Sequence, residues 1–149
     1  THAQHQEIIV LCGPPASGKS SFANEYNDRY EIICQDILKT KAKCLKKCRE
    51  TLSDSIIIDA TNRDVATRSC WIEYARSKNI PIRCVVMDVE KPLAMHLNTY
   101  RNAYGDKKVP AIAIHMFFSK YEPPTIGEGF SEIITLPFRS DNADLRRFV

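Results

Sequence analysis

The sequence contains no apolar run that approaches the ~18 residues required to cross a membrane, and its first residues, THAQHQE, contain no hydrophobic region of a signal peptide. It also contains no internal repeat and no low-complexity segment. We therefore expect a chain that stays inside the cell and has no membrane partner. Of the nucleus and the cytoplasm, we favour the nucleus. Because it opens on Thr1 rather than on methionine, we also expect a piece of a longer protein.

Cysteine is not arranged densely enough to build a disulfide framework. The 6 cysteines are scattered, and several lie inside apolar runs, which indicates free buried thiols in a reducing compartment. Cys44 and Cys48 are four residues apart and can share one face of a helix. Zinc would need further thiolate or imidazole ligands at a workable spacing, and none is evident, so packing is the favoured role of this pair.

A strong excess of charge is missing as well. The net charge of +3 and the pI near 8.5 permit a polyanionic partner but do not require one. The length of 149 residues and the hydrophobic fraction of 44% fit one ordinary globular domain. We expect a single domain over residues 1–149, monomeric as a domain.

The sequence does contain a regular alternation of short apolar runs with segments of helical length, which is typical of repeated βαβ units. The run SIIIDATN (55–62) is nearly continuous in aliphatic residues, as in a strand buried on both faces. The pattern predicts an α/β fold with a parallel β-sheet flanked by helices on both faces. The expected strands are 7–12, 30–34, 55–62, 82–89 and 132–136, and the expected helices are 20–26, 37–50, 64–77, 92–104 and part of 107–124.

The stretch CGPPASGKSS (12–21) carries the clearest chemical signal. It satisfies the pattern G-x-x-x-x-G-K-[ST] between an expected strand and an expected helix, which predicts a phosphate-binding P-loop and a P-loop kinase fold. Backbone N–H groups and the helix N-terminus bind phosphate, Lys19 reaches the β- and γ-phosphates, and the Ser20 hydroxyl reaches Mg²⁺. We expect ATP and Mg²⁺ as cofactors. The expected nucleotide-binding residues are Gly13, Pro14, Pro15, Ala16, Ser17, Gly18, Lys19, Ser20 and Ser21.

Two further motifs bear on the metal and on the kind of nucleotide. Neither a D-x-x-G switch nor an N-K-x-D base-reading motif stands at the expected strand ends, which disfavours a GTPase. Asp59 ends the run SIII, and ligands of parallel sheets bind at strand C-termini, so Asp59 and Ser20 are the expected metal ligands. The alternative for Asp59 is a helix or turn cap near Thr61 and Asn62.

The acceptor of the phosphate is suggested by Asp36 and by the segment after it. Asp36 follows the second expected strand, and we expect that edge to adjoin the strand that carries the loop. Its carboxylate would then face the γ-phosphate and orient an acceptor hydroxyl; the alternative is an N-cap for its own helix. The lysines that follow form a basic face, which either suits a polyphosphate strand or is merely solvated. The expected nucleic-acid contacts are Lys39, Lys43, Lys46, Lys47 and Arg68.

A later helix supplies a candidate lid. Arg101, Lys107 and Lys108 gather at the C-terminal end of the helix PLAMHLNTYRNAYGDKK. One interpretation is a lid that closes on the triphosphate and supplies positive charge to the transition state, which makes Arg101 a candidate catalytic residue beside Lys19 and Asp36. The other is that these cations only complement the helix dipole.

Five segments together resemble the kinase domain of eukaryotic polynucleotide kinase 3′-phosphatases: CGPPASGKSSF, CQDILKTKAKC, IIIDATNRDVATR, HLNTYRNAY and YEPPTIGEGFSEIITLPFR. The resemblance implies transfer of the ATP γ-phosphate to the 5′-hydroxyl end of DNA or RNA. It also implies that Lys19 and Ser20 serve the loop and that Asp36 activates the hydroxyl. By the same resemblance, Asp59 is the acidic residue after the third strand and Arg101 is the second lid arginine.

The chain departs from that kinase domain in two places. The loop reads PPASGKS where the family has a glycine-richer PGAGKS, and Thr99 stands where the family has its first lid arginine. The D-x-D-G-[ST] motif of the companion phosphatase is missing from these residues, so we expect no 3′-phosphatase activity here and a phosphatase domain elsewhere in a longer parent protein.

The sequence thus favours an ATP-dependent polynucleotide 5′-hydroxyl kinase that acts in nucleic-acid end repair. Two alternatives stay open at this point. One is a P-loop kinase of a small metabolite, for which the basic helix is only a solvated face. The other is a non-catalytic module that binds nucleic-acid ends and keeps the nucleotide loop as a switch or relic, for which Thr99 is the only support.

Overall fold

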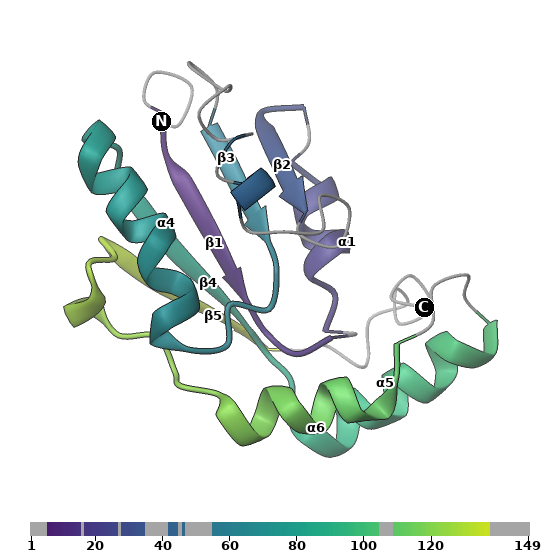
Figure 1. The fold of residues 1–149 in the computed structure, drawn as a ribbon. Coiled ribbons are helices and arrows are strands. Elements are labelled where there is room, and N and C mark those ends of the chain that lie inside the picture. Colours follow the sequence, from purple (N-terminus) through teal and green to yellow (C-terminus); the bar gives the residue numbers. More distant parts are fainter. Residues whose placement is uncertain are drawn as a thin grey trace.

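The structure, a computed structural model, describes residues 6–15, 17–26, 28–34, 42–44, 46, 55–104 and 109–137, without the side chains of Ser20 and of residues 101–104. Its centre is a sheet of five parallel strands in the order β2-β3-β1-β4-β5. The strands are β1 (Ile8–Cys12), β2 (Tyr30–Cys34), β3 (Ser55–Asp59), β4 (Ile82–Asp88) and β5 (Glu132–Pro137). Figure 1 shows their common direction.

Helices cover both faces of this sheet. The helices are α1 (Lys19–Asn24), α4 (Val65–Lys78), α5 (Lys91–Tyr104), α6 (Ala111–Lys120) and the short η2 (Ile126–Glu128). On one face α4 packs its Trp71 and Ala75 against alternate residues of β1 and β3, and on the other α1 packs Ala23 against the residues between them. The predicted architecture, a parallel sheet with helices on both faces, is confirmed.

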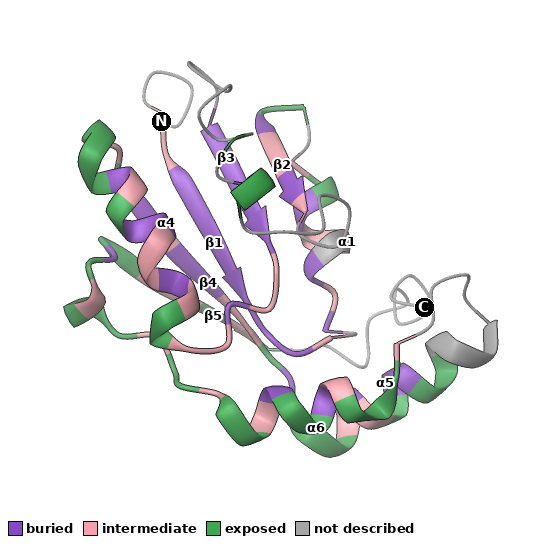
Figure 2. Cartoon of the chain, viewed as in Figure 1, coloured by how far each residue is buried: buried purple, intermediate pink, exposed green. Residues whose placement is uncertain are grey.

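The central strands are the most buried part of the molecule. Every residue of β1 and β3 is buried, whereas β2 and β5 at the two edges are partly exposed (Figure 2). Continuous aliphatic strands without a polar face are what a sheet covered by helices on both sides requires. The helix pair α5 and α6 shares a small core of its own around Leu97 and Ile114. That pair lies beyond the carboxyl ends of the strands (Figure 1).

The position of β2 corrects one expectation. We expected β2 to adjoin the strand that carries the phosphate loop, but β3 lies between them and pairs with both: Ile57 is in register with Ile9 of β1 and with Ile32 of β2. The reason is that SIIID is fully buried and therefore takes a central place, while the half-exposed YEIIC takes an edge. The chain leaving β2 thus starts two strand spacings, about 10 Å, from β1.

Other expectations concern the cysteines and the helix over 37–50. The five described cysteines are free thiols, and Cys44 is fully buried in the core, as its packing role requires. Cys48 and most of that helix lie outside the described residues, of which 42–44 and 46 are helical. Within the described part of the chain, no helix is long and apolar enough to span a membrane.

The burial of β3 yields a stability prediction. Ile57→Ala should lower the free energy of unfolding by about 2–5 kcal/mol, because the vacated volume is enclosed by β1, β2 and α1 and cannot be filled by solvent. Denaturant titration with a fixed m-value measures the change. The control is Ile112→Ala, since Ile112 is 64% exposed and should change stability by less than about 0.5 kcal/mol. Equal losses for the two variants would contradict a core centred on β3.

Candidate active site

The loop between β1 and α1 has the backbone that a P-loop requires. Gly18 has a φ of 89°, in the left-handed region that favours glycine, and immediately precedes α1. A Cβ at Gly13 would lie 2.9 Å from Ser17 Oγ and 3.0 Å from Met87 Cβ, so any larger residue would force Ser17 or Met87 to move. Both glycines are therefore needed to fold the chain tightly around the start of α1.

Lys19 closes this loop from the inside. Its side chain is largely buried, and Nζ donates hydrogen bonds to the carbonyl oxygens of Gly13, at 3.2 Å, and Pro14, at 2.8 Å. The first turn of α1 begins at the same point, where a helix presents its backbone N–H groups and the positive end of its dipole. An ammonium group and a helix N-terminus thus meet at the carboxyl edge of the sheet, an arrangement that attracts phosphate.

Asn62 ties the phosphate loop to the end of β3. Its Nδ2 donates to the carbonyl oxygens of Leu11, at 2.6 Å, and Ala60, at 3.3 Å, and its Oδ1 accepts a hydrogen bond from Trp71 Nε1 at 3.0 Å. The backbone at Asn62 is left-handed, with a φ of 47°. A second link runs from the Gly13 N–H to the Thr61 carbonyl at 3.1 Å. Since Asn62 is buried, these bonds are shielded from water and hold the two strand ends in a fixed relation.

Sequence reasoning missed this role of Asn62. It treated Asn62 only as a turn residue, and the turn interpretation agrees with the left-handed backbone. What it could not supply is the partner on β1, which is about fifty residues away in sequence. The available signal was the run of polar residues directly after a fully aliphatic strand.

The prediction that Arg68 contacts nucleic acid is wrong. Arg68 is completely buried and pairs with Glu128 through two hydrogen bonds, at 2.9 Å and 3.1 Å, while its Nη1 donates to the Asn62 carbonyl at 2.8 Å. Burial lowers the pKa of the Arg68 guanidinium, but the hydrogen bonds and charge of Glu128 raise that pKa by more. The side chain stabilises the turn after β3 and is not accessible to a strand.

Cys12, one residue before the loop, is a structural thiol. Its Sγ donates to the Asn62 carbonyl at 3.3 Å, and burial raises the pKa of the thiol despite the nearby positive charge of Arg68 and Lys19. Burial also raises the pKa of Cys84 to about 12. Thiols that stay protonated are poor nucleophiles, so neither cysteine serves the chemistry of this edge.

Asp59 stands at the carboxyl end of β3, the strand next to β1, and its side chain is buried. A hard cation such as Mg²⁺ takes oxygen ligands and usually combines one or two protein groups with water and substrate phosphates. The Asp59 carboxylate and the hydroxyl expected from Ser20 are two oxygen ligands of the kind that Mg²⁺ prefers. Its role as a metal ligand stays a prediction.

Of the other predicted site residues, some are exposed lysines and some lie outside the described part of the chain. Lys43 and Lys46 are exposed, as a contact with a nucleic-acid strand would require. Thr99, at the departure from the family's lid, is exposed on α5 and donates its hydroxyl to the Met95 carbonyl at 3.0 Å, an ordinary bond within a helix. The residues that lie outside the described part of the chain are Ala16, Asp36, Lys39, Lys47 and the side chains of Ser20 and Arg101.

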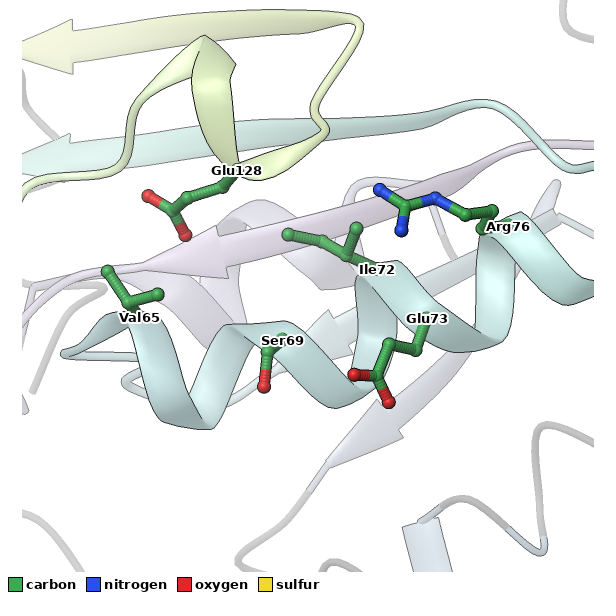
Figure 3. Close-up of a pocket in the computed structure, with 6 residues that line it drawn as sticks. All are labelled: Val65, Ser69, Ile72, Glu73, Arg76 and Glu128. Carbon is green, nitrogen blue, oxygen red and sulfur yellow. The ribbon is translucent and has the colours of Figure 1, made fainter.

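A hollow of about 130 Å³ lies elsewhere, between α4 and η2 (Figure 3). It is lined by Val65, Ser69, Ile72, Glu73, Arg76 and Glu128. None of these residues belongs to the predicted nucleotide or metal sites, and Glu128 is already paired with Arg68. The hollow is therefore separate from the predicted nucleotide and metal sites.

Comparison with known protein families agrees with this geometry. Residues 42–124, which run from the segment before β3 to the segment after α6, match the family described as AAA domain. The chain belongs to the AAA domain family. The matched region of this AAA domain contains Asp59 and Asn62 and more than half of the chain, while the phosphate loop precedes it.

Two curated relatives resemble this AAA domain closely. The chain is 42% identical over 142 residues to a bifunctional polynucleotide phosphatase/kinase of Schizosaccharomyces pombe and 37% identical over 148 residues to a putative bifunctional polynucleotide phosphatase/kinase of Acanthamoeba polyphaga mimivirus. The alignments cover 92% and 94% of this chain and 35% of each relative. The resemblance to the polynucleotide kinase 3′-phosphatase family is confirmed, and the chain spans about a third of these relatives.

Solved structures share the fold of this AAA domain. Chaetomium thermophilum Kti12, in complex with ADP-AlF3, has a TM-score of 0.75 at 18% identity, with 95% of this chain and 94% of that chain covered. A fungal RNA kinase has a TM-score of 0.67 at 19% identity, with 97% and 80% covered. At these identities the likeness shows the P-loop kinase fold.

The buried ion pair of Arg68 generates a second stability prediction. Glu128→Ala should lower the free energy of unfolding by about 3–5 kcal/mol, because it leaves the buried guanidinium without its counter-charge. Denaturant titration measures the loss. Glu73→Ala at the same hollow is the control and should have an effect below about 0.5 kcal/mol, since Glu73 is exposed. A loss as small as the control's would show that Arg68 is satisfied in some other way.

Proposed function

We propose that this chain is the kinase domain of a polynucleotide 5′-hydroxyl kinase, which transfers the γ-phosphate of ATP to the 5′ end of DNA or RNA in nucleic-acid end repair. The observation that carries the proposal is the tie between two strand ends: the loop closed by Lys19 is bonded through Asn62 and Thr61 to the end of the strand that carries Asp59. The names of the two curated relatives support a polynucleotide as the acceptor.

The loop suits a triphosphate. Gly13 leaves no space for a side chain behind the loop, Lys19 lies across it, and the first turn of α1 faces it. Mg²⁺ would be held by Ser20 and Asp59 and would neutralise the charge that develops on the β- and γ-phosphates. The ADP-AlF3 in the Kti12 complex supports nucleotide binding by this fold.

The chemistry is an in-line displacement at phosphorus. The oxygen of the 5′-hydroxyl forms a bond to the γ-phosphorus while the bond from that phosphorus to the β-phosphate oxygen breaks, and ADP leaves. Asp36 orients the hydroxyl and accepts its proton. Lys19 and, from the lid, Arg101 stabilise the negative charge on the transferred group. Lys39, Lys43, Lys46 and Lys47 contact the phosphates of the acceptor strand.

The longer protein also belongs to this proposal. Because the chain spans 35% of each relative and lacks the phosphatase motif, we propose that it is joined to a 3′-phosphatase domain in its parent. We propose a monomeric domain located in the nucleus.

Transfer of label from γ-labelled ATP to a 5′-hydroxyl oligonucleotide tests the proposal. Lys19→Ala and Asp36→Asn should each lower turnover by about 10²-fold or more, because one removes the charge that stabilises the transferred phosphate and the other removes the proton acceptor. The measurement is the initial rate at saturating ATP with Mg²⁺, with the unfolding midpoint as the check that each variant is folded.

The controls separate these roles from a general loss of charge. Lys120→Ala and Asp28→Asn change exposed lysine and aspartate side chains and should leave the rate within about twofold of the wild-type rate. A 5′-phosphorylated oligonucleotide should accept no label. Transfer to a small polyol instead of the oligonucleotide would indicate a metabolite kinase, and ATP binding without any transfer would indicate a silent binding module.

A further inference from the structure

Arg63 lies at the junction between the phosphate loop and the end of β3, and the function described above assigns it no role. It is two residues after Thr61, whose carbonyl accepts the hydrogen bond from Gly13 N–H at 3.1 Å. Two residues span at most about 7 Å, so the backbone of Arg63 is close to the first glycine of the phosphate loop. Because β3 separates β1 from β2, this junction lies between the strand that leads to the loop and the strand that leads to Asp36.

The backbone around Arg63 is rigidly held. The Arg63 carbonyl accepts a hydrogen bond from the Glu122 N–H at 2.7 Å. On one side, the Asn62 side chain is fixed by its bonds to β1. On the other, Asp64 begins α4 with a capping box, in which its carboxylate accepts a hydrogen bond from the Thr67 N–H at 2.8 Å. The side chain of Arg63 therefore extends from a preorganised turn, which lowers the entropy cost of binding a ligand there.

The guanidinium of Arg63 has spare donors. Its ion pair within the described part of the chain joins Nε to Asp64 Oδ2 at 3.7 Å, beyond the length of a hydrogen bond, and the side chain is 32% exposed. The Asp64 carboxylate is already engaged by Thr67, and that hydrogen bond is the main cause of its lowered pKa. Within the same described residues, both terminal nitrogens of Arg63 are open to a planar, two-oxygen partner.

Two other arginines of the described residues already have carboxylate partners, Arg68 on α4 and Arg83 at the amino end of β4. Arg68 is buried against Glu128, and Arg83 makes a two-bond pair with Glu7 at 2.8 Å and 2.9 Å. An arginine that is preorganised, half-buried and without a bidentate carboxylate, beside a loop that binds phosphate, is suited to bind a phosphate group. Within the segment 55–68, the arginine suited to bind a ligand at the carboxyl ends of the strands is thus Arg63 and not the predicted Arg68.

We propose that Arg63 binds a phosphate group at the carboxyl edge of the sheet, either the phosphate of ATP that is transferred or the first phosphodiester of the acceptor strand. The inference rests on the proposed function, because it takes the carboxyl end of β3, next to the phosphate loop, as the place where ATP and the acceptor strand meet. Arg63 is then a positioning residue that fixes the distance between the two. It also adds a positive charge where negative charge develops during transfer.

Equilibrium binding of Arg63→Gln to a 5′-hydroxyl oligonucleotide and to ATP·Mg²⁺ tests the inference without depending on turnover. Loss of a charge-assisted contact should weaken one of the two affinities by about tenfold or more. If the acceptor strand is the source of the phosphate, oligonucleotide affinity falls and its salt dependence loses about one unit of slope, while ATP affinity is unchanged. If the nucleotide is the source, ATP affinity falls and the salt slope of oligonucleotide binding is unchanged.

Two further variants control for charge and folding. Arg76→Gln removes an exposed arginine from the opposite end of α4, about 20 Å away along the chain, and should change neither affinity. Arg63→Lys keeps the charge without the planar fork and should recover part of the lost affinity. The unfolding midpoint of each variant should match that of the wild type, since the Arg63 side chain stabilises little.

The outcomes separate this inference from the proposed function. Affinities of Arg63→Gln within about twofold of wild type, or an equal loss in Arg76→Gln, would overturn the role of Arg63. Wild-type protein that binds but transfers no label would contradict the proposed kinase activity, and the binding comparison would still decide on Arg63. Wild-type protein that binds neither oligonucleotide nor ATP would overturn both.

Discussion

The hydrogen bonds of the buried Asn62 side chain are the constraint on which the rest of the site depends. The Asn62 amide donates to the Leu11 carbonyl in β1 and to the Ala60 carbonyl directly after β3, and it accepts from Trp71 on α4, so that two strand ends and a helix share one polar centre. A buried amide with satisfied donors and acceptor fixes one geometry, because any shift would leave polar groups without partners. The phosphate loop and the strand end that carries Asp59 are therefore positioned together rather than separately.

The sheet order explains why several chemistries meet at one edge. All five strands are parallel, so their carboxyl ends and the segments that leave them face the same way. Placing β3 between β1 and β2 sets Asp59 beside the loop and the exit of β2 one strand farther away. A donor nucleotide on the loop and an acceptor beyond β3 would then approach from two sides, with Arg63 on the turn between them.

Much of this arrangement was predictable from sequence. Local patterns predicted the bounds of the five strands to within three residues and the turn with glycines that follows β1, because glycine, lysine and aliphatic runs act over a few neighbouring residues. The order of the strands in the sheet was not predictable from local pattern, since it depends on which buried strand takes the central position. The fate of Arg68 depends on Glu128, which lies 60 residues away, and the partner of Asn62 is equally remote. Long-range partners of polar side chains escape any reading of local pattern.

Hydrogen exchange at single-residue resolution, measured with and without ATP·Mg²⁺, tests most directly whether nucleotide binds at this edge and whether the two strand ends respond as one. The account predicts that the backbone amides of Gly13, of residues 17–20 and of residues 59–63 become protected together, because Asn62 and the bond from Gly13 to Thr61 couple them. Protection confined to 13–20 would contradict the coupling. Protection around the hollow between α4 and η2, with none at the loop, would contradict the location of the site.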